Sequence, residues 1–170
     1  VNTLVVTIPS VILPLIIAAN AAFAFTFIEF KGREVMFAAL VALMVLPLQS
    51  ALIPVLKGMV WLKKNVGIDI VGNFAAAWIM HAAFALPLAI YILRNFMMTL
   101  PTSLIEAARI DGASYYQIFW KLILPMSMPS IASFAIFQFL WVWNDYLIAF
   151  IFVGEQKSVM TYKLLRLIGQ

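Results

Sequence analysis

The chain has 170 residues, of which 65% are hydrophobic and only 11% are charged, and its formal net charge is +4. Soluble domains of this size are about 45–50% apolar and about 25% charged, so the composition excludes an ordinary soluble domain and indicates a membrane protein. The absence of Cys excludes disulfides and Cys-based zinc sites in this sequence. Its basic residues are scattered among apolar runs and form no continuous stripe, which discounts nucleic acid as a partner.

Long charge-free runs predict four membrane-spanning helices. About 20 apolar residues cross the hydrocarbon core as a helix, and runs of adequate length cover residues 1–28, 35–56, 70–93 and 122–153. The last run carries no charge as far as Asn144 and stays apolar beyond Asp145. A soluble four-helix bundle would show polar faces at helical period, which these runs almost lack. The predicted fold class is all-α, a polytopic membrane bundle forming a single transmembrane domain, 1–170.

Four spans place their connections alternately on the two sides of the membrane. Residues 29–34 and 94–121 then share one side, and residues 57–69 share the other with the tail, 154–170. The first side carries five Lys or Arg residues and the second carries six. The positive-inside rule therefore does not orient the chain.

Five prolines interrupt the predicted spans: Pro9, Pro14, Pro47, Pro54 and Pro87. Each lacks a backbone donor and tends to kink a helix. In lipid, the carbonyls freed in this way must find partners in neighbouring helices or in a water-filled cavity. Two interpretations remain open, namely irregular packing in a bundle and kinked helices that line a pathway.

The third connection contains a polar insert, EAARIDGASYYQIFWKLILP, at residues 106–125. Ser103, followed three residues later by Glu106, predicts a capping box at a helix start. Asp111-Gly112 is predicted to break this helix, because Gly adopts backbone angles that other residues resist. A second short helix is predicted over residues 113–121. Two short helices around a glycine turn at the membrane surface would form a knob suited to docking a soluble partner.

This insert resembles the EAA signature of the permeases of binding-protein-dependent ABC importers. The residues that match are Glu106-Ala107-Ala108, Asp111-Gly112-Ala113, Phe119 and Leu122-Ile123-Leu124-Pro125, with Leu122 standing where isoleucine is commoner. Residues 137–152 (FQFLWVWNDYLIAFIF) resemble the carbohydrate-uptake, malG-like branch of this family. Residues 47–54 and 86–91 look closest to alpha-glucoside permeases.

The resemblance implies a multi-pass subunit of the inner (plasma) membrane of a bacterial-type cell, which imports a sugar or oligosaccharide. The implied partners are a second permease subunit, two ATPase subunits, an extracytoplasmic solute-binding protein and the lipid bilayer. The chain has no phosphate-binding P-loop, so ATP hydrolysis would belong to a separate ATPase chain. We expect neither an enzyme nor a cofactor. Members of this family have about six helices, so the chain is expected to be a fragment that lacks terminal helices.

The resemblance also assigns roles to residues of the insert. The loop at about 94–125 would be cytoplasmic and would dock into a cleft on the ATPase. Glu106 would pair with a basic residue of the ATPase, and Gly112 would allow the turn. The small side chains would permit close approach. The predicted docking residues are Glu106, Ala107, Ala108, Asp111, Gly112, Ala113, Phe119, Leu124 and Pro125.

Candidates for the substrate pathway are Trp143, Asn144, Asp145 and His81. Asp145 either faces the pathway beside Asn144 and bonds sugar hydroxyls, or is a hydrated acid in an interfacial aromatic belt. A carboxylate at the bilayer centre costs about 2.5–3.5 kcal/mol. His81 is either a packing donor between helices or a pathway residue. A single His and no Cys predict no metal site.

Two other functions remain open. One is an ABC permease of the same architecture for a non-sugar solute. The spans hold no Arg or Lys for a phosphate group, which favours a neutral solute. The other is a secondary transporter or channel that works without an ATPase.

Overall fold

The computed structural model describes residues 2–68, 70–153, 159–161 and 163–164, and the regular elements within them are helices. In chain order they are α1 (Asn2–Phe27), α2 (Arg33–Ala42), η1 (Leu43–Val45), α3 (Leu48–Val66), α4 (Phe74–Met97), α5 (Thr102–Ile110), α6 (Tyr115–Ile118), η2 (Phe119–Ile123), α7 (Leu124–Met126), α8 (Met128–Asn144) and α9 (Leu147–Phe152). The predicted all-α fold class is confirmed. Asp69 and most of the predicted tail, 154–170, lie outside the described residues.

Two of the described helices are long and apolar enough to cross a membrane singly. They are α1, with 26 residues, and α4, with 24 residues. Up to four spans result if each of two bent helix pairs crosses as one unit. These numbers agree with a polytopic membrane bundle.

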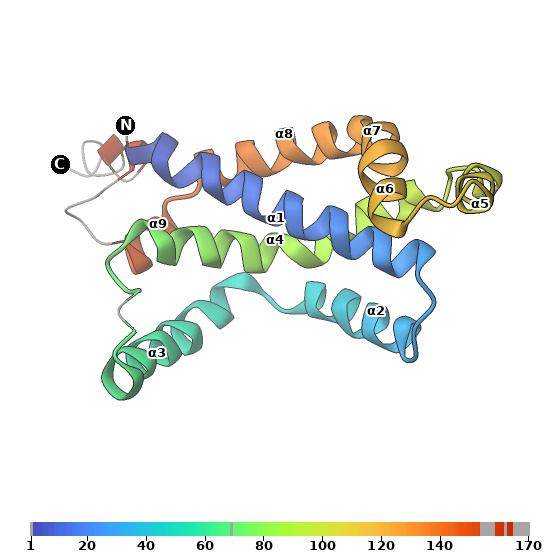
Figure 1. The fold of residues 1–170 in the computed structure, drawn as a ribbon. Coiled ribbons are helices and arrows are strands. Elements are labelled where there is room, and N and C mark those ends of the chain that lie inside the picture. Colours follow the sequence, from blue (N-terminus) through green and yellow to red (C-terminus); the bar gives the residue numbers. More distant parts are fainter. Residues whose placement is uncertain (1, 69, 154–158, 162, 165–170) are drawn as a thin grey trace.

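Helix α1 lies at the centre of the bundle. It packs against α4 and α8, and in Figure 1 α1 and α4 run in the same direction while α8 runs back beside α1. The α1–α2 turn and the segment from α5 to α7 lie at the same end of the bundle (Figure 1). The polar insert therefore sits beside the end of the central helix.

Small side chains allow α1 and α4 to pack closely. Ala18 and Ala22 of α1 and Ala85 and Ala89 of α4 are fully buried in one hydrophobic cluster. Small residues let helix backbones approach each other, and this close packing is a main source of helix association in lipid.

The two prolines of α1 free carbonyls that side chains of neighbouring helices bind. Pro9 cannot donate to the carbonyl of Val5, four residues earlier, and the Trp78 indole N–H of α4 donates to that oxygen at 2.8 Å. Pro14 likewise cannot donate to the carbonyl of Ser10, and Gln138 Nε2 of α8 donates there at 3.3 Å. Gln138 is fully buried. For these two prolines, the freed carbonyls find partners in neighbouring helices.

The charge-free run at residues 35–56 is not one straight helix. After the 3-10 turn η1 the chain becomes extended at Leu46 (φ −69°, ψ 121°), directly before Pro47. Proline disfavours the helical region for the residue that precedes it. Helix α3 then continues to Val66, so residues 57–66, which were expected in a loop, are helical. Lys63 and Lys64 lie in its last turn, where basic side chains interact favourably with the helix macrodipole.

The run at residues 122–153 is also divided. Residues Tyr115–Met126 form one helical unit that meets Met128–Asn144 at 68°. The π-helical turn η2 ends two residues before Pro125. The ring of Pro125 would clash with the carbonyl of Lys121 in a regular α-helix. A second break at Asp145 separates α8 from α9.

We expect Gln138→Leu to lower the free energy of unfolding by about 1–3 kcal/mol, because the Ser10 carbonyl freed by Pro14 loses its donor. In a Pro14→Ala background, residue 14 has an N–H that can donate to Ser10. The same Gln138→Leu change should therefore cost about 0.6–1.7 kcal/mol less there. Equilibrium unfolding of the full-length protein in detergent micelles measures both costs. Equal costs in the two backgrounds would contradict this role of Gln138.

Candidate functional site

Helix α5 projects from the end of the bundle where α1 ends (Figure 1). Its one buried residue is Ile105, which joins the hydrophobic cluster of α1 and α4. Glu106 and Ala107 are exposed. The helix therefore rests on the bundle through an apolar side chain and presents most of its surface outward.

The predicted capping box at Ser103 and Glu106 is wrong. Helix α5 begins at Thr102 after an extended Pro101, and no side chain caps its N-terminus. A capping box forms instead before α6, where the Gln117 N–H donates to Ser114 Oγ at 3.3 Å and the Ser114 N–H donates to Gln117 Oε1 at 2.9 Å. Both sequences fit the Ser-x-x-Glu/Gln pattern, and only the second follows directly after a glycine turn.

Gly112 forms the turn between the two short helices. Its φ of +82° lies in the left-handed region, which glycine adopts without a Cβ penalty. The Ala113 N–H donates to the Ala108 carbonyl at 2.9 Å, and the Gly112 N–H donates to the Arg109 carbonyl at 3.0 Å. These two bonds define a Schellman motif, which satisfies carbonyls at the end of α5. Ala108 and Ala113 thus have a direct role in shaping the turn.

A cation–π contact spans the same turn. The Arg109 guanidinium carbon lies 5.0 Å from the centroid of the Tyr115 ring, and Tyr115 meets Phe23 of α1 edge-on at 6.4 Å. The contact between Arg109 and Tyr115 was not predicted from the sequence. The contact joins α5 to the start of α6, and Tyr115 continues it to the bundle.

Phe119 anchors the second short helix on α1. Its ring lies 5.2 Å from the ring of Phe23, and it is buried together with Ile118 and Ile123. These three side chains belong to the same hydrophobic cluster as the alanines of α1 and α4. The segment therefore packs directly against the central helix.

We call residues 102–126 the Gly112 segment. Of the nine predicted docking residues, five are exposed, three are half-buried and one is buried. The exposed ones are Glu106, Ala107, Asp111, Gly112 and Pro125, the half-buried ones are Ala108, Ala113 and Leu124, and the buried one is Phe119. Ile110 and Tyr116, which are not among the predicted docking residues, are 86% and 72% exposed. Both side chains lie beside the Gly112 turn, so they are available for contact with a partner.

Of the four pathway candidates, His81 and Asp145 lie close together, whereas Asn144 and Trp143 make local contacts within α8. His81 of α4 and Asp145 of the α8–α9 break lie together, with 3.8 Å between His81 Nε2 and Asp145 Oδ2. The same carboxylate oxygen accepts the Ile148 N–H at 3.0 Å. The Asn144 amide donates back to the Leu140 carbonyl at 2.7 Å and is exposed. Trp143 stacks on Phe139 at 5.4 Å.

A hollow of about 680 Å³ lies beside these groups. It is lined by Leu88, Phe137, Leu140, Trp141, Asn144 and Asp145. Trp141 thus lines the hollow, whereas the predicted pathway residue Trp143 is not among its lining residues. The hollow combines aromatic rings with one amide and one carboxylate. That combination suits a ligand with both apolar faces and hydroxyl groups, such as a sugar ring.

Metal binding has no support in the described residues. Within residues 2–68, 70–153, 159–161 and 163–164, His, Asp and Glu side chains form no group of three that could hold a metal ion.

Comparison with known proteins covers nearly the whole chain. Residues 2–166 match the family described as "Binding-protein-dependent transport system inner membrane component". The chain is 48% identical to the alpha-glucoside transport system permease protein AglG of Rhizobium meliloti, over 99% of this chain and 44% of that relative. It is 47% identical to the osmoprotective compounds uptake permease protein GgtD of Synechocystis sp., over 99% of this chain and 55% of the relative.

A more distant relative is also named as an import permease. The chain is 31% identical to the melibiose/raffinose/stachyose import permease protein MelC of Bacillus subtilis, over 92% of this chain and 55% of that relative. The chain therefore spans about half the length of these relatives.

We expect Gly112→Ala to destabilise the turn by about 1–2 kcal/mol, because a left-handed backbone places Cβ too close to a carbonyl oxygen. Apart from atoms of Gly112 and its two chain neighbours, nothing lies within 4 Å of the added Cβ, so the cost is conformational. Amide exchange at Ala113, whose N–H closes the turn, should accelerate by about 5- to 30-fold.

The matched control is Gly58→Ala in the interior of α3, where nothing lies within 4 Å either and φ is not positive. That change should stabilise its helix by about 0.8–1.0 kcal/mol. If Gly112→Ala left exchange at Ala113 unchanged, the Schellman turn would not need its glycine.

Proposed function

The chain belongs to the family of binding-protein-dependent transport system inner membrane components, and we propose that it is a membrane-spanning permease subunit of an ATP-driven importer. The observation that carries the proposal is the Gly112 segment, which exposes an apolar tip at one end of a membrane bundle and is anchored to the central helix by Phe119. ATP hydrolysis belongs to a separate ATPase chain. The permease binds that chain and catalyses nothing itself.

The Gly112 segment docks into a cleft of the ATPase. Ile110 is 86% exposed, and its burial in the cleft supplies hydrophobic contact. Glu106, which has no capping role, pairs there with a basic residue of the ATPase. The left-handed Gly112 turns the chain so that α5 and α6 enter together. A knob of this shape needs a preformed socket on its partner.

The partners and the orientation follow from this docking. The end of the bundle that carries α5 and the α1–α2 turn faces the cytoplasm, and the end that carries the α3–α4 turn faces outward. Two such permease subunits form the pathway in a bacterial inner membrane. Two ATPase subunits bind below, and a solute-binding protein delivers the solute from outside. ATP-driven closure of the ATPase pair moves the helices as rigid bodies and alternates access to the pathway.

The solute is a sugar or oligosaccharide. Relatives named for alpha-glucosides and for melibiose, raffinose and stachyose support this class. We place the solute in the hollow beside α8, where Trp141 stacks on an apolar sugar face. Asn144 and Asp145 bond its hydroxyls, and the buried His81 lies 3.8 Å from the Asp145 carboxylate. GgtD, named for osmoprotective compounds, favours one alternative, a permease of the same architecture for another small solute.

A cysteine cross-link tests the docking. In a Cys-free background of the full-length permease, Ile110→Cys should form a disulfide with a Cys in the cleft of the co-expressed ATPase. The yield should change when ATP binds. The matched control is Val66→Cys, which is 55% exposed at the far end of α3. A link from residue 66 and none from residue 110 would reverse the orientation and remove the basis for docking.

Substitution of Asp145 tests the pathway. Asp145→Asn keeps the shape and removes the charge, so the KM for transport should rise about tenfold or more, since hydrogen bonds to charged groups contribute about 1.5–3 kcal/mol. The control is Glu29→Gln, an exposed acid in the α1–α2 turn, which should leave the KM unchanged. If Asp145→Asn transported with the native KM, Asp145 would belong to an interfacial belt and not to the pathway.

A further inference from the structure

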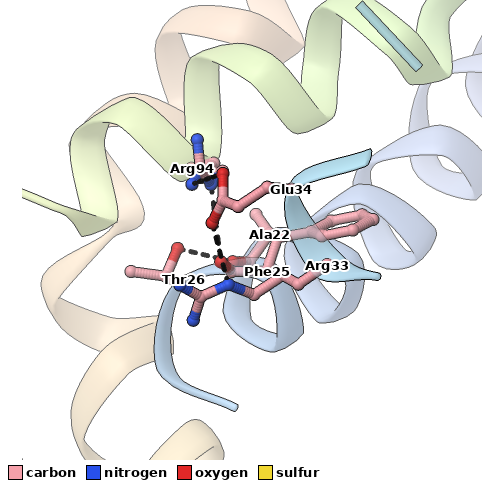
Figure 2. A network of polar contacts seen from close by, with 6 residues as sticks. All are labelled: Ala22, Phe25, Thr26, Arg33, Glu34 and Arg94. Carbon is pink, nitrogen blue, oxygen red and sulfur yellow. Dashed lines mark hydrogen bonds and ion pairs between the residues drawn. The ribbon is translucent and has the colours of Figure 1, made fainter. Parts of the chain in front are cut away.

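Arg94 connects three helices at the end of the bundle that carries α5 (Figure 2). It lies in the last turn of α4, and its side chain is only 13% exposed. Its Nε donates to the Phe25 carbonyl of α1 at 3.4 Å, and its Nη2 lies 3.5 Å from Glu34 Oε2 of α2. Its guanidinium carbon lies 3.9 Å from the centroid of the Phe37 ring, also on α2.

Each of these contacts has a separate physical basis. The Phe25 carbonyl is among the last four of α1, which have no partner within the helix, and a cation is favourable at that negative helix end. Glu34 lies in the first turn of α2, and it is exposed, so its ion pair with Arg94 is weak by itself. The Phe37 ring adds a cation–π contact to a largely buried guanidinium. One planar group thus bonds the end of α1 and the start of α2 at the same time.

The link from Arg94 to α5 is short and hydrogen-bonded. The Met98 N–H donates to the Arg94 carbonyl at 2.9 Å, and the Leu100 N–H donates to the Met97 carbonyl at 3.2 Å. The Thr99 hydroxyl donates to the Phe96 carbonyl at 2.7 Å. Helix α5 begins at Thr102. A displacement of α5 therefore reaches the last turn of α4 through a stiff turn.

We propose that Arg94 is the positioning residue through which movement of α5 reaches α1 and α2. It makes the ends of these helices move with α4 as one unit when the ATPase pulls on the Gly112 segment. This inference rests on the proposed function, since it assigns a route for the coupling that docking begins. It differs from a purely structural role, in which Arg94 would hold the bundle together without affecting the use of ATP.

The first test compares solute transported per ATP hydrolysed in the complete transporter with full-length chains. Arg94→Met keeps the apolar part of the side chain and removes the guanidinium group. The ratio of solute transported to ATP hydrolysed should therefore fall by about fivefold or more while ATP hydrolysis continues. Arg94→Lys keeps the charge but cannot hold both the Phe25 carbonyl and Glu34, so it should give an intermediate ratio.

The matched control is Arg33→Gln. Arg33 Nε lies 3.0 Å from the other oxygen of Glu34, but Arg33 is the neighbour of Glu34 in sequence and joins no second helix through it. This change should leave the ratio native. Should Arg94→Met not fold, the second variant combines Glu34→Gln with Phe37→Leu, which removes both contacts of Arg94 with α2 while the Phe25 contact persists, and it should lower the ratio. A native ratio in Arg94→Met or in this double variant would overturn the inference.

The separation of two spin labels distinguishes the proposed coupling from a purely structural role of Arg94, because a structural role would not change how this separation responds to ATP. We place them at Thr102, the exposed start of α5, and at Val35 of α2, which is 75% exposed. In the native transporter their separation should stay constant between nucleotide-free and ATP-bound states. In Arg94→Met it should change with ATP. A separation that changes in the native transporter would show that α2 does not follow α5, and would overturn the inference.

The cross-link from residue 110 to the ATPase distinguishes a failure of the proposed docking from a failure of the Arg94 inference. If the native transporter forms no such link, the proposed docking fails and the inference fails with it. If the link forms and responds to ATP while Arg94→Met keeps the native transport ratio, the docking stands and the inference alone is wrong.

Discussion

The need to satisfy backbone carbonyls inside a bilayer determines how this bundle is assembled. Helix α1 contains two prolines, and each leaves one carbonyl without its helical donor. In lipid there is little water to bind these oxygens, so another helix must supply the donor. Trp78 of α4 binds the Val5 carbonyl and Gln138 of α8 binds the Ser10 carbonyl. The irregular central helix is thereby tied to both neighbours, and the prolines specify partners instead of only disturbing a helix.

The same helix organises the end of the bundle where the Gly112 segment lies. Phe23 of α1 contacts Phe119, and the Phe25 carbonyl accepts the Arg94 side chain. The turn itself is built from local interactions, namely the Schellman bonds around Gly112 and the capping box at Ser114. The Gly112 segment is thus stable locally and packs on α1. A force on this segment would act on a helix that is already bonded to α4 and α8.

Sequence predicted the features that depend on composition and local chemistry. Apolar runs predicted the helices, since a bilayer leaves few other structures available, and the left-handed glycine was visible as Asp111-Gly112. Sequence did not separate prolines that end a helix from those that stay inside one. Pro47 stands at a break, whereas Pro87 lies within α4.

The sequence also did not predict which residues far apart in the chain contact each other. The partners in the Trp78–Val5 bond lie 73 residues apart, and those in the Gln138–Ser10 bond lie 128 residues apart. The proximity of His81 and Asp145 and the contacts of Arg94 are of the same kind, because helical period shows which face a residue occupies but not which helix lies opposite.

The proposed docking is tested most directly by a cryo-electron microscopy structure of the full-length transporter with its ATPase subunits. We predict that the Gly112 segment sits in a cleft of the ATPase with Ile110 buried. A structure in which α5 lies away from the ATPase and Ile110 stays in solvent would contradict the account.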